Sequence, residues 1–438
     1  MEADKTTLDD LNILKGEDGY SVSDKLNHTR TIPGQQQLRR LLAQPLQSLE
    51  QIQQMQQTLQ WLQSRLTEWP TRISNGTIMV LEKFYETPID PLPAQVTTWD
   101  AWQYRILHHA DYSLVKYSAT HGFDFIKGLQ ELLRLCLNEH TPEPLRSLLL
   151  NLQQRLQQPA FEIVDKHPNA AALSIPQLLQ FARFLRFRYK HEMLELLQFH
   201  AQLDAWYSMA RASETLNFAF PQFTATESPL VEASGLFHPL LKEPVSYELN
   251  LSPDQNFLFL TGANMAGKST FIKSVGIAVY LAHLGMAVPT RSMRLSFFDG
   301  LLSNINIHDN IFRGESYFYN EVMRIRSTIQ KVSNQRRWLI LIDELFKGTN
   351  VQDAMKCSSL VIEGLIKIKS STFILSTHLY EIGAALEVHS NIRFNYFETQ
   401  VEGDQLQFSY QLKEGISNDR LGYLILKKEG VVQLLEHL

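Results

Sequence analysis

One segment constrains the fold of this 438-residue chain more than any other. The run NFLFLTGANMAGKSTFIKSVG contains the spacing Gly262-x-x-x-x-Gly267-Lys268-Ser269, after an apolar stretch and before a helical pattern. Glycines let successive backbone N–H groups turn toward an anion, and the helix that follows directs the positive end of its dipole to the same point. The spacing therefore predicts a phosphate-binding loop between a strand and a helix. The alternative is a glycine-rich turn with a surface lysine.

The residues of this loop have separate expected roles in binding and hydrolysing a nucleoside triphosphate. Lys268 supplies a cation near the β- and γ-phosphates, where it would also act in catalysis, and the hydroxyl of Ser269 offers Mg²⁺ the oxygen ligand that this ion prefers. The nucleotide-binding set predicted here is Gly262, Ala263, Asn264, Met265, Ala266, Gly267, Lys268, Ser269 and Thr270.

Two acids follow directly after a second apolar run. Residues 338–342 read as a buried strand, and Asp343 and Glu344 come next. The carboxyl ends of parallel strands lie at the edge of the sheet where a phosphate loop also lies. Asp343 is therefore expected to hold Mg²⁺ through water, and Glu344 to orient or deprotonate the attacking water. A core strand followed by a solvated acidic turn is the alternative.

Two further polar residues are candidates with weaker support from their surroundings. His378 lies in LSTHLYE, directly after the strand-like residues 372–375, where it is expected to contact the γ-phosphate or the attacking water. The alternative for His378 is a histidine with a structural role. Ser316 lies in FRGESYFYNEV, which by itself reads only as a polar turn before the aromatic start of a helix.

The two halves of the chain have different hydrophobic patterns. Residues 35–66, 127–158 and 176–211 carry apolar side chains at helical spacing, and the last stretch would form one helix of roughly 50 Å. Beyond residue 217, the short apolar runs 256–260, 338–342 and 372–375 alternate with helical patterns, which is typical of a largely parallel α/β sheet. We therefore predict a helical domain over residues 1–215 and an α/β P-loop domain over residues 216–438.

Charge and composition exclude several classes of protein. The net charge is −5 and the pI is about 6.3, so the chain is not a broadly basic nucleic-acid binder. Its 2 cysteines form no metal-ligand pattern and suggest a reducing compartment. The longest apolar stretch, near residues 275–288, is shorter than the roughly 20 residues that a membrane helix needs. A cytoplasmic protein without a membrane segment is the expectation.

Beyond these separate motifs, the sequence resembles the MutS family of DNA mismatch-repair ATPases. TGANMAGKST is similar to the family's phosphate loop, including the pair Asn264-Met265, and DELFKGTN and STHL resemble its acidic and histidine segments. ESYFYNE lies where the family has its signature segment, so Ser316 would correspond to the signature serine. GLFHP, which contains His238, resembles the His-Pro near the start of the family's ATPase domain and adds His238 to the nucleotide-binding candidates.

The resemblance implies an ABC-type P-loop ATPase domain that hydrolyses ATP with Mg²⁺. In the family, two such domains pair head to tail and each signature segment completes the site of the partner, which implies an ATP-dependent homodimer. The segment LNHTRTIPGQQQLRRLLAQPL resembles the start of the family's all-helical core, or lever, domain. The predicted architecture is therefore a lever domain followed by an ABC-type ATPase domain.

The chain also departs from the family pattern. The mismatch-reading and connector domains of the family have no counterpart in the sequence, so we expect no mismatch reading by this chain on its own. Ala266 replaces a glycine of the family loop, and Tyr317-Phe318 replace the Thr-Phe of the signature. If Ala266 must adopt a positive φ, the substitution costs roughly 1 kcal/mol.

Two hypotheses for function remain open. The first is an ATP-dependent protein of DNA repair or recombination that binds double-stranded or branched DNA, with a repair protein as a further candidate partner. The second is an ATP-gated protein-interaction module with no direct DNA role. The candidate DNA contact is a basic run with interleaved aromatics, which also reads as an amphipathic helix with its charges solvated. The run comprises Arg183, Phe184, Arg186, Phe187, Arg188, Tyr189 and Lys190.

Overall fold

Contacts divide the chain into two compact units. The computed structural model describes residues 1–16, 19–93, 96–226, 228–306, 317–402 and 405–417, together with Val431 and Leu434. The first unit, which we name the sheet unit, comprises Met1–Lys25, Leu42–Ile52 and Thr215–Leu438. The second, the helical unit, comprises Leu26–Leu41 and Gln53–Glu214. The domain boundary at 215/216 stays a prediction, because this division also assigns two early segments to the sheet unit.

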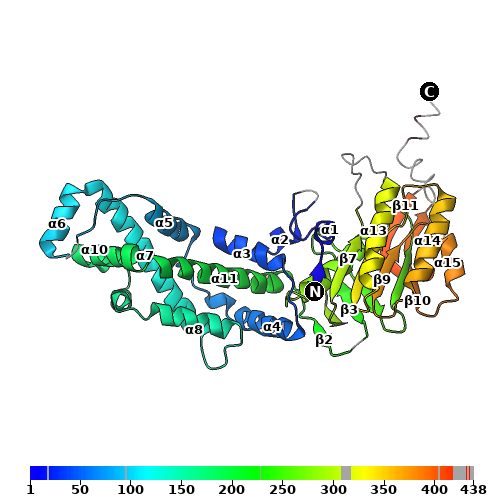
Figure 1. Ribbon diagram of the computed structural model, residues 1–438, viewed down its shortest axis with the longest axis horizontal. Helices are drawn as coiled ribbons and strands as arrows, with labels where there is room; N and C mark the ends of the chain where they lie inside the picture. The colour runs from blue at the N-terminus through cyan, green and yellow to red at the C-terminus, as the bar shows by residue number, and fades with distance from the viewer. Residues whose placement is uncertain are drawn as a thin grey trace. The chain divides into compact units, whose positions relative to one another are not determined.

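The helical unit is organised around one long helix, α7 (His109–Cys136). It packs against α5 (Asn75–Glu86), α6 (Thr98–Leu107), α8 (Leu145–Leu156) and α10 (Ile175–Arg183) (Figure 1). Ser74 and Thr97 begin α5 and α6 with capping boxes, which satisfy N–H groups that the first turn of a helix leaves unpaired. The remaining helices that reach into this unit are α3 (Ile32–Leu42), α4 (Leu49–Gln63), α9 (Glu162–Lys166), α11 (Lys190–Thr215) and the short turns η1 (Leu66–Glu68), η2 (Pro159–Phe161) and η3 (Ala170–Ala172).

The prediction of one continuous helix over residues 176–211 is wrong. The helix α10 ends at Arg183, a π-helical turn η4 (Phe184–Arg188) follows, and α11 begins at Lys190. The wider turn brings the rings of Phe184 and Tyr189 together at 5.2 Å, and each ring packs edge-on against Phe161. Aromatic packing with a distant segment therefore determines the turn, and such a contact leaves no sign in the local period.

The basic run in this turn does not form one solvated stripe. The guanidinium of Arg186 donates hydrogen bonds to the carbonyl oxygens of Phe84 and Thr87. Tyr189 is buried, and its hydroxyl donates to the carbonyl of Arg155 at 2.5 Å. The side chain of Phe187 is 58% exposed. The amphipathic interpretation expected buried aromatic rings and solvated charges. It holds for the buried Tyr189, but it fails for Arg186, which is hydrogen-bonded within the protein, and for the exposed Phe187.

The sheet unit contains a seven-stranded sheet in the order β1-β7-β8-β9-β5-β10-β11. Its pairings are parallel except between β10 (Ile392–Glu402) and β11 (Gln405–Glu414). The strands β5 (Phe257–Thr261), β8 (Trp338–Asp343) and β9 (Thr372–Ser376) confirm the three predicted apolar strands, and all their residues are buried. A second sheet has the order β2-β6-β3-β4, with β2 (Gln222–Thr224), β6 (Ser292–Ser296), β3 (Val231–Leu236) and β4 (Tyr247–Leu251).

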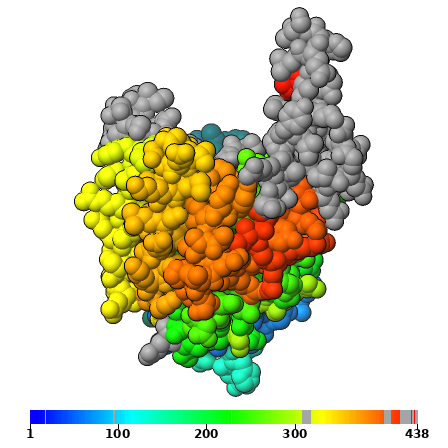
Figure 2. Space-filling view, turned by 90° about the vertical axis from the view of Figure 1, so that its right-hand side faces the viewer, coloured from blue at the N-terminus to red at the C-terminus, as the bar shows by residue number. Residues whose placement is uncertain are grey.

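Helices cover the seven-stranded sheet on both faces. Side chains of α13 (Tyr317–Val332), α14 (Val351–Leu365) and α15 (Glu381–Leu386) join one core with alternate residues of the strands, and these helices lie side by side in Figure 2. The helix α12 (Lys268–Ala282), which is almost entirely buried, covers the other face. There a Cβ added to Gly276 would lie 2.6 Å from Leu341, so glycine permits close packing of α12 on β8.

The first residues of the chain complete one edge of this sheet. The strand β1 (Glu2–Ala3) pairs in parallel with β7 (Gly300–Asn304), and the helices α1 (Lys5–Asp10) and α2 (Val22–Lys25) follow. The buried carboxylate of Asp10 accepts a hydrogen bond from the hydroxyl of Ser303 and from the N–H groups of Ile305 and Asn306, each at 3.1 Å. Asp10 therefore fixes the backbone at the end of β7.

Within the described part of the chain, each helix is too short or too polar to cross a lipid bilayer.

Candidate active site

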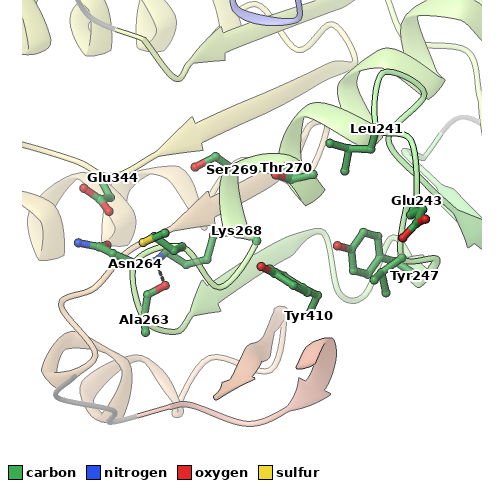
Figure 3. A pocket seen from close by; sticks show the side chains of 13 residues that line it. Leu241, Glu243, Tyr247, Ala263, Asn264, Lys268, Ser269, Thr270, Glu344 and Tyr410 are labelled. Carbon is green, nitrogen blue, oxygen red and sulfur yellow. Dashed lines mark hydrogen bonds between the residues drawn. The ribbon is translucent and has the colours of Figure 1, made fainter. Parts of the chain in front are cut away.

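A pocket of about 480 Å³ opens above the loop that joins β5 to α12. Figure 3 shows Glu344 toward one end of this pocket and Tyr247 toward the other. The lining residues are Leu241, Glu243, Val245, Tyr247, Ala263, Asn264, Met265, Gly267, Lys268, Ser269, Thr270, Glu344 and Tyr410. Seven of the nine predicted loop residues thus face the pocket, while Gly262 and Ala266 lie behind the lining.

The backbone of the loop explains where glycine is needed. Gly262 and Gly267 have φ values of 135° and 107°, in the region that favours glycine. A Cβ on Gly262 would also lie 3.1 Å from the carbonyl oxygen of Phe397. The expected strain at Ala266 does not occur, because the positive φ of 67° belongs to Met265 instead. Alanine at position 266 is therefore compatible with this loop conformation.

Lys268 is buried at the first turn of α12. Its Nζ donates to the carbonyl oxygens of Gly262 at 2.8 Å and Ala263 at 3.0 Å, and Figure 3 draws the second bond. Burial lowers the pKa of Lys268, while the nearby Glu344 and Asp343 act in the opposite direction. The ammonium group of Lys268 is thus held against the backbone at the start of the loop.

Asp343, at the end of β8, receives hydrogen bonds from two serine hydroxyls. Ser269 donates to Oδ2 and Ser376 donates to Oδ1. Ser376 ends the neighbouring strand β9, where it is the direct register partner of Asp343. Sequence reasoning did not identify Ser376, although its position at the end of an apolar run, two residues before His378, was a usable signal. The predicted pair Ser269 and Asp343 is thus in contact.

Glu344 lies between a lysine and a histidine. Its Oε2 is 3.4 Å from Lys347 Nζ, and its Oε1 is 3.6 Å from Nδ1 of His378. Burial opposes ionisation of Glu344, but the neighbouring His378, Lys347 and Lys268 outweigh it and lower its pKa to about 2. Glu344 is therefore a carboxylate at neutral pH, and His378 lies beside it; the contact of His378 with the γ-phosphate or the attacking water stays a prediction.

His238 and Ser316, the two remaining candidates, are not part of this arrangement as described. His238 lies outside the pocket lining; it is 8% exposed, and burial together with the charge of Lys273 lowers its pKa to about 4. Its Nδ1 accepts the N–H of Leu240 at 3.4 Å, which fits a neutral structural histidine. Ser316 lies outside the described residues.

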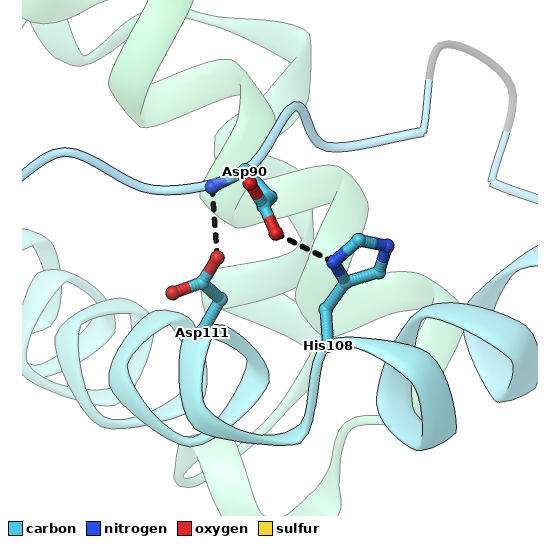
Figure 4. Close-up of side chains that lie close together, drawn as sticks. All are labelled: Asp90, His108 and Asp111. Carbon is cyan, nitrogen blue, oxygen red and sulfur yellow. Dashed lines mark hydrogen bonds and ion pairs between the residues drawn. The ribbon is translucent and has the colours of Figure 1, made fainter.

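A cluster of charged side chains in the helical unit reads as a helix junction. His108 ends α6 and precedes α7, and its Nδ1 lies 2.7 Å from Oδ2 of Asp90 (Figure 4). The N–H of Asp90 donates to Asp111 at 2.8 Å. Asp90, His108 and Asp111 could each offer one atom to a metal ion, and these atoms lie within 4.8 Å of one another. However, the hydrogen bonds among the three residues already have a structural role, because they fix the segment after α5 to the junction of α6 and α7.

Three features together define a P-loop ATPase domain: the strand order, the loop between β5 and α12, and the two acids at the end of β8. A comparison with known protein families finds a match in the same region: residues 258–434 match the family model of MutS domain V. This part of the chain is a MutS-type ATPase domain, and a largely helical region precedes it. The match confirms the predicted family resemblance, fold class and ATPase activity, and it implies ATP binding.

Proposed function

We propose that the sheet unit hydrolyses ATP with Lys268, Glu344 and His378 as its catalytic groups. The observation that carries this proposal is the convergence of Lys268 and Ser269 with Asp343 and Glu344, from two segments far apart in the sequence, beside the pocket. Lys268 would bind the β- and γ-phosphate oxygens as a cation. Glu344, ionised and close to His378, would orient the attacking water and accept its proton, and His378 would contact the γ-phosphate or this water.

Ser269 and Asp343 fit a magnesium ion. Their side-chain oxygens are in hydrogen-bonding contact beside the phosphate loop, and hard oxygen donors are the ligands that Mg²⁺ prefers. When bound, Mg²⁺ would neutralise phosphate charge that develops in the transition state. Ser376 would hold the carboxylate of Asp343 in the orientation that this role requires.

The nucleotide base would occupy the opposite end of the pocket. Tyr247, Tyr410, Leu241 and Val245 line the pocket, with Tyr247 and Leu241 on the side away from Glu344 (Figure 3), and flat apolar and aromatic surfaces suit a purine ring. The sequence motifs did not indicate this part of the site, because the four residues come from segments on either side of the loop.

We further propose that ATP joins two copies of the chain head to tail, with Ser316 of each copy completing the site of the other. The MutS family forms ATPase dimers in general, and ATP can shift the equilibrium toward a dimer only if it binds the paired state more tightly. We expect the Glu344→Gln variant to bind ATP, hydrolyse it at least about 100-fold more slowly and accumulate as a dimer. Size-exclusion chromatography with light scattering, with and without ATP, tests this. Lys268→Ala in the same background serves as the matched control that should stay monomeric, and a dimer fraction unaffected by ATP would contradict the proposal.

For the chain as a whole we propose an ATP-dependent role in DNA repair or recombination, without mismatch reading of its own, in the cytoplasm. Both cysteines are free, which suits a reducing compartment.

One observation favours the alternative, an ATP-gated protein-interaction module: Trp99, Trp102 and Ile106 of α6 are 76%, 48% and 67% exposed on one helix face. Titration of salt against binding to linear and branched duplexes, with and without ATP, separates the two. Affinity that falls steeply with salt supports DNA binding, while equally weak binding to all duplexes supports the alternative.

A further inference from the structure

Glu321, on the second turn of α13, is a buried carboxylate outside the roles described so far. The residue is 2% exposed. Its Oε1 accepts the backbone N–H of Lys347 at 3.0 Å, and its Oε2 accepts the N–H of Gly348 at 3.2 Å. Burial raises the pKa of Glu321, while these N–H groups act in the opposite direction by stabilising the ionised form. Both oxygens of this side chain therefore hold the backbone of a single turn.

This turn begins at Glu344 and has an unusual backbone. Glu344 and Phe346 have φ values of 65° and 59°, in the left-handed region that side chains other than glycine rarely adopt. Conformations of this kind persist only where the surroundings hold them. The N–H of Glu344 donates to the carbonyl of Ser376 at 3.0 Å, which fixes the start of the turn on β9. Glu321 fixes the other end.

The turn also carries the cation beside Glu344. Lys347 offers its N–H to Glu321, while its Nζ lies 3.4 Å from Oε2 of Glu344. Movement of the turn away from Glu321 would change both the φ of Glu344 and the distance to this cation. The orientation of the Glu344 carboxylate thus depends on a contact made by a different helix.

We propose that Glu321 is a positioning residue, which sets the orientation of Glu344 through residues 345–348 and links α13 to the hydrolysis step. The inference rests on the proposed role of Glu344. A carboxylate matches this turn because it presents two acceptors to two N–H groups, whereas an amide of the same shape presents one acceptor and one donor. The helix α13 begins one residue after Ser316 in the sequence, so a displacement of α13 would reach Glu344 along this route.

The Glu321→Gln variant tests the proposal, because a positioning role should lower kcat and leave the affinity for ATP unchanged. We expect kcat to fall about tenfold, because a small misplacement of a catalytic group lowers the rate while the phosphate loop is unchanged. The affinity for a fluorescent ATP analogue should stay within about twofold of the wild type, since Glu321 does not line the pocket. Thr328→Val is the matched control and should keep wild-type kcat: it removes a buried polar group on α13 whose hydroxyl donates to the carbonyl of Arg324 and accepts from Asn304, not from the turn.

A double-mutant cycle distinguishes positioning from a general loss of stability. If Glu321 acts through Glu344, then Glu321→Gln should have little further effect on single-turnover hydrolysis in a Glu344→Gln background. An equal loss in both backgrounds, or an unchanged kcat in the single variant, would overturn the inference. If Glu321→Gln does not fold, Glu321→Asp replaces it, and its shorter carboxylate should give an intermediate kcat. Absence of hydrolysis by the wild type would contradict the proposed function itself.

Discussion

The ion pair between Asp4 and Arg324 gives a quantitative prediction for the N-terminal segment. Oδ2 of Asp4 lies 2.7 Å from the guanidinium of Arg324 on α13, and Oδ1 accepts the N–H of Thr7 at 2.9 Å as the cap of α1. Replacement by asparagine keeps a good helix cap and removes the charge. The Asp4→Asn variant therefore measures what the charge of Asp4, which also lies 3.6 Å from Nζ of Lys331, contributes to the attachment of β1 and α1.

The expected size of the effect follows from the pKa of Asp4. Burial opposes ionisation, but the Arg324 hydrogen bond and charge and the Thr7 donors lower this pKa from 3.8 to about 2. At about 1.36 kcal/mol per pKa unit, the difference corresponds to about 2.4 kcal/mol at neutral pH. The side chain of Asp4 is 25% exposed and asparagine keeps part of the Thr7 contact, so we expect a loss of about 1.5 kcal/mol. Because the folded pKa is the lower one, this stability is present above pH 3.8 and is lost as the pH falls toward 2.

Hydrogen exchange measured by mass spectrometry on a peptide covering β1 and α1 tests this prediction. At pH 7 the amides of α1 should exchange roughly tenfold faster in Asp4→Asn than in the wild type, and about half of the free-energy difference should remain at pH 3. Glu2→Gln is the control, because Glu2 is 48% exposed and lies 3.3 Å from Arg336, an arrangement worth no more than about 0.5 kcal/mol. Equal protection of Asp4→Asn and wild type at pH 7, or a difference that does not shrink in acid, would refute the reasoning.

Three further predictions concern the phosphate loop, the helical unit and the pH dependence. Lys268→Ala should weaken ATP binding by roughly 100-fold, the loss of a charged contact worth about 2–3 kcal/mol, and calorimetry that shows unchanged affinity would contradict this. Gly34→Ala places a Cβ 2.1 Å from Oδ2 of Asp204 and should lower the free energy of unfolding of the helical unit by about 2–3 kcal/mol. Gly364→Ala is the control and should cause no loss, because a Cβ at this position would have no neighbouring atom within 4 Å. Equal melting temperatures for the two variants would count against the packing argument. Since the pKa of Glu344 is about 2, its carboxylate should stay ionised from pH 8 to pH 5, and NMR that detects protonation of this carboxylate within that range would contradict the value.

The sequence predicted those parts of the site that depend on local spacing. The loop from Gly262 to Ser269 and the strand before Asp343 are continuous stretches, and their residue types are sufficient to predict their conformation. Because parallel strands end at a common edge, the contact between Ser269 and Asp343 also followed from the sequence. These inferences needed only the period of the strands and the position of the glycines.

Other features depend on the alignment of distant segments, which local patterns do not reveal. Ser376 meets Asp343 because of the register between β8 and β9, and Tyr410 reaches the pocket from β11. The strand β1 has two residues, too few to show a period of two. Glu321 is recognisable as part of the site only when its two N–H donors, 26 and 27 residues away, are seen.

Because β1 and α1 belong to the sheet unit, a fragment of the chain made for ATPase assays needs these N-terminal residues. A recombinant fragment cut at residue 216 would leave the N–H and C=O groups of β7 uncovered along one side, and unpaired strand edges promote aggregation. It would also leave the N–H groups of Ile305 and Asn306 without the carboxylate of Asp10. Fusing the first 25 residues to such a fragment through a flexible linker should restore the missing border strand and yield material that stays in solution.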